Sequence, residues 1–136
     1  MNQEIDAFVE STVEKFTLDR DKSELRVDVS CVFGDQKRRT IVARGIDSLI
    51  LDDLGACNII DRVILFAPED AIEEANQCTS ELIYLMQKRE LSKSDFAWPA
   101  FTDKLALIRS GKLRLMTVEA VAGASGVVLA RDITFE

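Results

Sequence analysis

Apolar and polar residues alternate most regularly between Ser23 and Phe33. The apolar positions are Leu25, Val27, Val29, Cys31 and Phe33, and the polar positions between them are Glu24, Arg26, Asp28 and Ser30. A strand with this pattern buries one face and exposes the other, which is typical of an antiparallel sheet. We therefore predict a strand over 23–33, a turn over 34–37, a returning strand over 38–46 and a short further strand over 47–51.

A second apolar run leads into the longest predicted helix. Residues 59–66 are mainly β-branched and apolar, which is typical of a strand covered on both faces. Pro68 then suits a first helical position, acidic residues occupy the next turns, and Lys88 and Arg89 stand at the other end. One stripe recurs between them at helical spacing: Ala71, Ile72, Ala75, Cys78, Thr79, Leu82, Leu85 and Met86. The pattern predicts a long central helix over 68–90.

The N-terminal segment also shows helical spacing. Its apolar positions are Ile5, Phe8, Val9, Thr12, Val13 and Phe16, and Asn2 stands where an N-cap would. We predict a helix over 3–16. Its apolar stripe must be buried, either on the sheet of the same chain or on a second copy, so a homodimer is one alternative.

The last third of the chain predicts a short helix over 102–110 and a closing hairpin. The hairpin strands are predicted over 113–121 and 127–135, with a turn over 123–126. Together the elements predict an α+β fold, with a single antiparallel sheet of about five strands and an N-terminal helix and a long central helix packed on one face. We predict that residues 1–136 form a single domain.

Charge and composition restrict the partners. The net charge of −7 argues against nucleic acid, whose phosphates require a basic face, and permits a basic protein partner, although it also fits a merely soluble protein. No apolar run reaches the roughly 20 residues of a membrane span, and the N-terminal residues do not resemble a signal peptide. The three cysteines show no paired spacing, so we expect reduced thiols and a cytoplasmic protein that does not bind membranes.

The chain contains no histidine, which restricts its chemistry. This absence excludes a histidine general base, a Ser-His-Asp triad and a histidine-ligated zinc site. Carboxylates, lysine and tyrosine remain available for catalysis. From the sequence we predict no catalytic residue, no metal site and no cofactor.

Asp52 and Asp53 form the first candidate binding site. They are adjacent and stand close to Gly55 and Asn58. Such carboxylates can hold a hard cation, but the alternating acidic spacing of a calcium loop is missing. Because Asp, Gly and Asn also supply turn geometry, we favour a solvated turn.

Phe96, Trp98 and Phe101 form the second candidate binding site. These large aromatic side chains flank Pro99 outside the predicted regular structure. They can close the core as a plug, or bind a partner as a hot spot. We favour the plug, because a monomer rarely leaves a large apolar patch exposed.

Two functions fit these features. The first is a non-catalytic protein-protein interaction module, of the adaptor, inhibitor or immunity type, that binds a basic target. The alternative is a small-molecule-binding protein or a carboxylate-based enzyme with a pocket between sheet and helices, in which Asp28, Asp52 or Asp53 is the acid or base. A deep pocket around an ionisable residue with a displaced pKa would favour the alternative.

Overall fold

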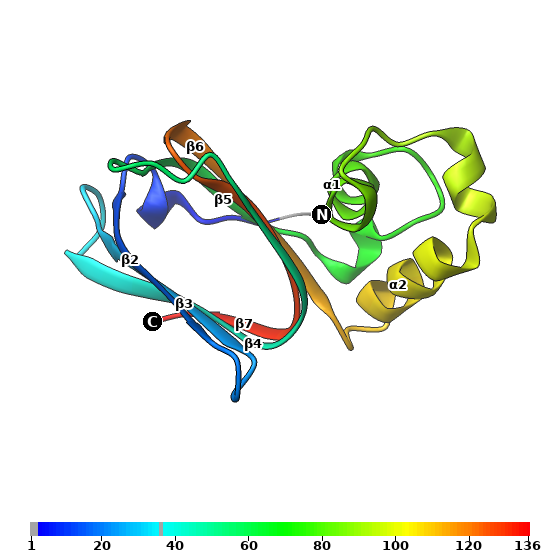
Figure 1. The fold of residues 1–136 in the computed structure, drawn as a ribbon, viewed down its shortest axis with the longest axis horizontal. Coiled ribbons are helices and arrows are strands. Elements are labelled where there is room, and N and C mark those ends of the chain that lie inside the picture. Colours follow the sequence, from blue (N-terminus) through cyan, green and yellow to red (C-terminus); the bar gives the residue numbers. More distant parts are fainter. Residues whose placement is uncertain (1–2, 36) are drawn as a thin grey trace.

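A computed structural model describes residues 3–35 and 37–136 (Figure 1). The predicted N-cap, Asn2, lies outside the described residues. The strands are β1 Gln3–Glu4, β2 Thr12–Asp19, β3 Glu24–Ser30, β4 Arg38–Asp52, β5 Ile59–Leu65, β6 Arg114–Ala122 and β7 Ser125–Phe135. The helices are α1 Gln77–Gln87 and α2 Pro99–Arg109, with 3-10 turns η1 Asp6–Phe8, η2 Pro68–Asp70 and η3 Lys93–Ala97. The fold is α+β with an antiparallel sheet, as predicted in broad terms.

The predicted single sheet of about five strands is wrong, because six long strands curl into a ring. Their order is β2-β3-β4-β7-β6-β5, and the two-residue β1 adds to β5. The ring is joined where Thr12 of β2 pairs with Ile59 of β5. The backbone N–H of Val13 donates to the Asn58 carbonyl oxygen at 2.8 Å beside this pair. Closure removes most of the exposed sheet edge that an open sheet would present.

The ring creates two cores in place of one. Side chains that point inward from the strands fill its interior, among them Leu25, Val27 and Val29, which are buried as predicted. Side chains that point outward from β5, β6 and β7 meet α1 and α2, which lie together on that side of the ring (Figure 1). Alternate residues of one strand therefore serve different cores, as Leu115 and Met116 of β6 do.

The predicted N-terminal helix does not exist. Its residues form β1, η1 and β2, and β2 pairs with β3 over its whole length. A β-bulge between Val13 and Lys15 explains the misleading spacing, because the extra residue turns Val13 and Phe16 onto the same inner face. Residues three apart lie on one face of a helix and on opposite faces of a regular strand, but a bulge between them brings them to the same face of a strand. Ile5, Phe8, Val13 and Phe16 of the apolar stripe, for which a dimer was the alternative, pack inside the ring of this chain.

The predicted long central helix is less than half present. Pro68 begins only the short turn η2, and α1 begins after Asn76, whose Oδ1 accepts a hydrogen bond from the Thr79 N–H at 2.9 Å. The Asn76 Nδ2 also donates to the Asp70 carbonyl oxygen at 2.8 Å and holds the chain in a turn there. Lys88 ends α1 in the left-handed conformation, with φ of 52°. The hydrogen bonds of the Asn76 side chain therefore set the start of the helix at Gln77, although the helical spacing of apolar residues begins earlier in the chain.

β4 replaces the two strands predicted over 38–46 and 47–51. It continues through a bend at Gly45, which has φ of 66°, and through a register shift between Ile46 and Ser48. The positive φ at Gly45 is a conformation that residues with a side chain rarely adopt, so the bend favours glycine. The first half of β4 pairs with β3, and the second half curves away to run beside β7 alone.

Other predictions are confirmed with small shifts. The strand over 59–66 is β5, and the closing hairpin is β6 and β7. The short helix predicted over 102–110 is α2, which begins at Pro99. Within the described residues, neither helix has the length and hydropathy to span a membrane.

Candidate functional site

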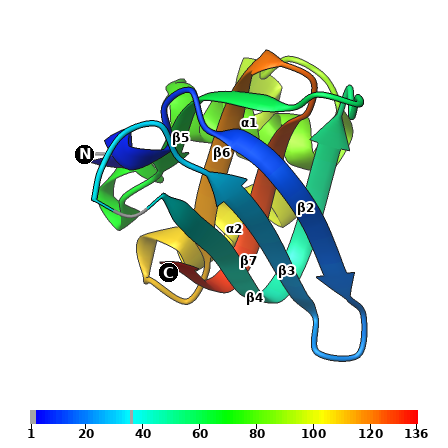
Figure 2. The ribbon, with the colours of Figure 1, turned by 90° about the vertical axis from the view of Figure 1, so that its left-hand side faces the viewer.

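One end of the ring gathers both exposed apolar side chains and carboxylates. We call it the acidic end and define it as Leu51, Asp52, Asp53, Leu54 and Val121. The first four residues end β4 and begin the loop to β5, and Val121 lies near the end of β6. Both segments lie at the same end of the ring, with the β6–β7 turn (Figures 1 and 2).

Asn58 fixes the loop of the acidic end to the β6–β7 turn. Its side-chain Oδ1 accepts from the Ala124 N–H at 2.8 Å and from the Gly55 N–H at 3.1 Å, and its Nδ2 donates to the Gly55 carbonyl oxygen. Gly123 has φ of 79°, and a Cβ there would lie 2.3 Å from Asn58 Oδ1. Because Gly123 has no side chain, the β6–β7 turn can approach Asn58 closely. The hydrogen bonds of Asn58 then hold the loop of the acidic end against this turn.

The acidic end exposes three large apolar side chains. Leu54 is 62% exposed, Val121 61% and Leu51 37%. Residues 48–61, which include Asp52, Asp53 and Asp61, contain no lysine or arginine, whereas Glu119 on β6 is paired with Arg62. An apolar centre with charges of one sign is a typical recognition surface.

Tyr84 connects the acidic end to α1. Its hydroxyl donates a hydrogen bond to Asp52 Oδ2 at 2.6 Å. This bond raises the pKa of Tyr84 above its usual value, with partial burial and the charges of Asp52 and Asp53 acting in the same direction. Asp52 is therefore oriented by a helix, whereas Asp53 points from a left-handed residue, with φ of 60°, into solvent.

A small groove lies beside this contact, between α1 and the sheet. Its volume is about 150 Å³, and its polar lining includes Asp52, Glu81, Tyr84 and Glu119. Burial raises the pKa of Glu81, and the charge of Glu119 raises it further. Glu119 is held by Arg62, whose Nε lies 2.6 Å from its Oε2. The groove thus contains one carboxyl group whose pKa lies above its usual value.

The alternative of a cation held by Asp52 and Asp53 gains no support from the geometry. The two side chains do not converge, since Asp52 turns toward Tyr84 and Asp53 is exposed. Across residues 3–35 and 37–136 no cluster of three or more acidic, cysteine or histidine side chains has metal-binding geometry.

The aromatic segment lies at the far side of the helical layer. Phe101 is fully buried, and its ring meets Phe96 edge-on with centroids 5.6 Å apart. Phe96 and Trp98 are half-buried against the same core. The structure therefore places these residues away from Asp52 and Asp53, and their packing favours the plug over a hot spot.

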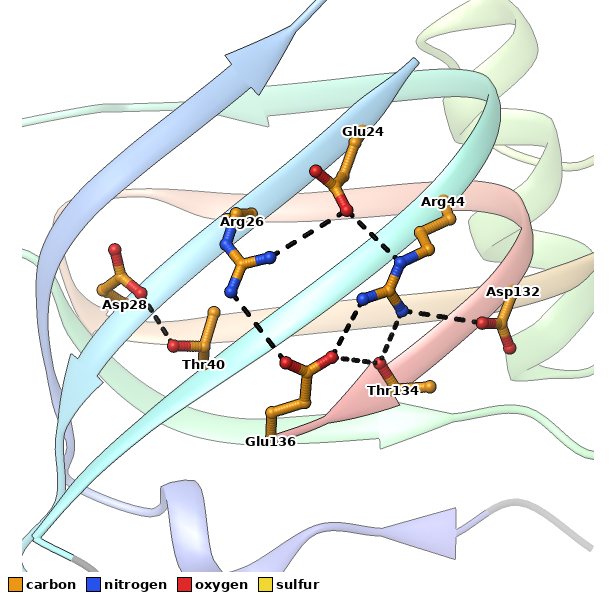
Figure 3. A network of polar contacts seen from close by, with 8 residues as sticks. All are labelled: Glu24, Arg26, Asp28, Thr40, Arg44, Asp132, Thr134 and Glu136. Atoms are coloured by element: carbon orange, nitrogen blue, oxygen red, sulfur yellow. Dashed lines mark hydrogen bonds and ion pairs between the residues drawn. The ribbon is translucent and has the colours of Figure 1, made fainter. Parts of the chain in front are cut away.

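A charged network on the outer face of β3, β4 and β7 has no counterpart in the sequence analysis (Figure 3). Arg44 lies 3.2 Å from Glu24 and 3.0 Å from Glu136, and Arg26 lies 3.9 Å from each of the same carboxylates. Beneath them Val42 is completely buried. The alternating charged residues at 24, 26 and 28 indicate an exposed face of the strand, but which charged residues they pair with depends on the strand register. These charges are matched within the chain, unlike those of the acidic end.

Comparison with known proteins shows a fold but no family. No family model and no curated protein matches the chain. Its structure is similar to the crystal structure of an uncharacterized protein from Neisseria gonorrhoeae, with a TM-score of 0.53 and 11% sequence identity. The match covers 100% of this chain and 97% of that chain. At this identity the likeness supports the α+β fold alone.

Proposed function

We propose that the chain is a non-catalytic protein-protein interaction module, of the adaptor, inhibitor or immunity type, and that the acidic end binds a basic partner. The observation that carries this proposal is the combination of Leu51, Leu54 and Val121, all exposed, with Asp52 and Asp53 and no neighbouring cation in the sequence. An apolar centre supplies binding energy, and the carboxylates supply selectivity and faster association.

The distribution of matched and unmatched charge supports this choice of surface. The network around Arg44 neutralises its own carboxylates, so it offers little to a partner. Asp53 is exposed, and neither Lys nor Arg occurs in the segments around it. A basic partner would find its complementary charge there. The reducing cytoplasm fits this proposal, because Cys57 is exposed beside the acidic end and would remain a thiol.

Affinity capture from a native lysate tests the proposal. The bait variant combines Asp53→Asn and Leu54→Ser, which alters one exposed charge and one exposed apolar side chain. The matched control combines Asp103→Asn and Val32→Ser, which alters one exposed charge and one exposed apolar side chain elsewhere, since Val32 is 56% exposed and Asp103 is exposed on α2.

We expect a basic protein to be retained by the wild type and the control, and to be lost or strongly weakened with the Asp53–Leu54 variant. Retention by all three baits would contradict the acidic end as the contact. Capture of an acidic protein, or of none, would contradict the proposed partner chemistry.

A second candidate function rests on Glu81. A carboxyl group with a raised pKa beside Tyr84 is a suitable general acid, and the groove lies between sheet and helices. Its volume of about 150 Å³ is, however, below the roughly 300 Å³ at which ligand pockets usually begin. A metabolite that raises the melting temperature of the wild type but not of Glu81→Gln would favour this function over the interaction module.

A further inference from the structure

The ring is incompletely closed along one side, beside the acidic end. β3 pairs with β4 only as far as Arg44, and β7 pairs with the other edge of β4 as far as Asp52. The Ile46 N–H still donates to the Ser23 carbonyl oxygen at 3.1 Å. Beyond it, no strand in the described part of the chain pairs with the outer edge of residues 47–52.

The facing edge belongs to β2. This strand pairs with β3 throughout but meets β5 only at Thr12. Residues 14–19 and residues 47–52 are therefore edges without a paired strand between them, and Figure 2 shows β2 and the second half of β4 facing each other. A narrow apolar slot lies there, and its lining includes Val13, Phe16, Leu51, Val118 and Val128.

The two edges differ in how well they are protected. β2 carries a bulge at Glu14 and exposes Glu14 and Lys15, features that discourage pairing with another strand. β4 is protected only at its start, where Asp47 is bound by Lys104 at 2.7 Å. Residues 48–51 then read Ser-Leu-Ile-Leu, without proline or lysine. The outer edge of β4 is thus the receptive one.

We propose that the basic partner contributes an extended segment that pairs with the outer edge of β4 over residues 47–52. This inference rests on the proposed function and specifies how the partner is bound. Main-chain hydrogen bonds to the free edge supply affinity, and alternate side chains of an added strand face opposite sides. Apolar side chains of the segment would cover Leu51 and the slot, while lysine or arginine would reach Asp52 and Asp53.

A synthetic probe separates strand addition from simple surface attraction. The probe is a nine-residue peptide of alternating lysine and valine, and its control is the same peptide with N-methylated backbone amides on one edge. N-methylation removes the donors but keeps every charge and side chain. A peptide of alternating glutamate and valine tests the sign of the charge. Binding is measured by fluorescence anisotropy, and protection of β4 by amide hydrogen exchange.

We expect the lysine peptide to bind, to slow exchange of amides within residues 47–52, and to lose roughly tenfold or more in affinity on N-methylation. Equal binding of the N-methylated peptide, with protection confined to the loop after Asp53, would overturn strand addition and leave the proposed function intact. Failure of the lysine peptide to bind better than the glutamate peptide would count against the proposed function itself. Protection of the β4 edge without peptide, in a dimer detected by sedimentation, would identify a second copy as the occupant and overturn the proposal.

Discussion

The Tyr84 hydroxyl lies 2.6 Å from Asp52 Oδ2, so the last residue of β4 is bonded to the middle of α1. This contact joins the helical layer to the acidic end. It also orients one of the two carboxylates on which the proposed function depends, and it leaves Asp53 free to meet a partner.

The Tyr84–Asp52 bond makes a spectroscopic prediction. Tyr84 is the single tyrosine of the chain, so ultraviolet titration reports it alone. Because the hydrogen bond to Asp52 raises its pKa, we expect ionisation above the usual pH near 10, and a return toward that value in Asp52→Asn. Identical titration curves for the two proteins would show that the bond is not made in solution.

The Arg89–Asp95 pair predicts acid sensitivity of the helical layer. The Arg89 Nη1 donates to Asp95 Oδ2 at 2.9 Å, and the pair, with the Ser92 N–H, lowers the pKa of Asp95 to about 2. A carboxyl pKa that is lower in the folded state stabilises the fold above the unfolded pKa near 4, and this stability is lost as the pH falls toward 2. In urea melts across pH 2–5, Asp95→Asn should lose much of this dependence. The same substitution at exposed Asp103 should not, and equal curves would contradict the pairing.

The two faces of β3 predict different costs of substitution. Val29 is 2% exposed, and Val29→Ala should lower the free energy of unfolding by roughly 1–3 kcal/mol. Asp28 is half-buried, where the sequence predicted exposure, and its Oδ1 accepts from the Thr40 hydroxyl at 2.7 Å. Asp28→Ala should therefore cost about 1 kcal/mol or less. Urea melts with the reverse order would mean that the two faces are exchanged.

The two glycines with the same backbone conformation predict a matched pair of effects. Gly111 and Gly123 both have φ of 79°, but only at Gly123 would a Cβ meet neighbours, Asn58 Oδ1 and the Cys57 carbonyl oxygen. Gly111→Ala should cost about 1 kcal/mol of unfolding free energy, from backbone strain alone. Gly123→Ala should cost roughly 2 kcal/mol or more, because the loop must move. Equal losses would show that the loop of the acidic end is not packed on the hairpin.

The three cysteines differ in accessibility. Cys57 is exposed, whereas Cys31 and Cys78 are buried, and burial raises the pKa of Cys78 to about 12. A thiol reagent should react quickly with one thiol of the folded protein and with all three after denaturation without reductant. Fewer than three thiols in the denatured protein would reveal a disulfide and contradict the proposed cytoplasmic location.

Local pattern predicted β3, β5 and the closing hairpin of β6 and β7, and it failed at β2 and at the start of α1, where a bulge and a side-chain hydrogen bond decide the backbone. The alternation around Val27 is direct evidence of two faces and was interpreted correctly. The spacing of Val13 and Phe16 was not, because a bulge gives a strand the three-residue spacing of a helix. The start of the central helix was misplaced because Asn76 bonds to the preceding turn, which composition does not reveal.

The candidate site was predictable only in part. Adjacent aspartates before a glycine marked Asp52 and Asp53, but nothing in the sequence places Val121 at the same end of the ring, which follows from the strand pairing. Tyr84 was missed because its partner lies 32 positions away in the chain. The aromatic segment was a candidate site because of its composition, and its side chains pack in the core formed with the helices.

The salt dependence of the captured complex tests the central claim most directly. The screening length falls from about 10 Å at 0.1 M salt to about 3 Å at 1 M. If Asp52 and Asp53 attract a basic partner, the dissociation constant should rise steadily over this range, and less steeply for the Asp53→Asn variant than for the wild type. A partner that stays bound unchanged in 1 M salt would contradict the acidic end as the contact and would direct attention to the segment around Trp98.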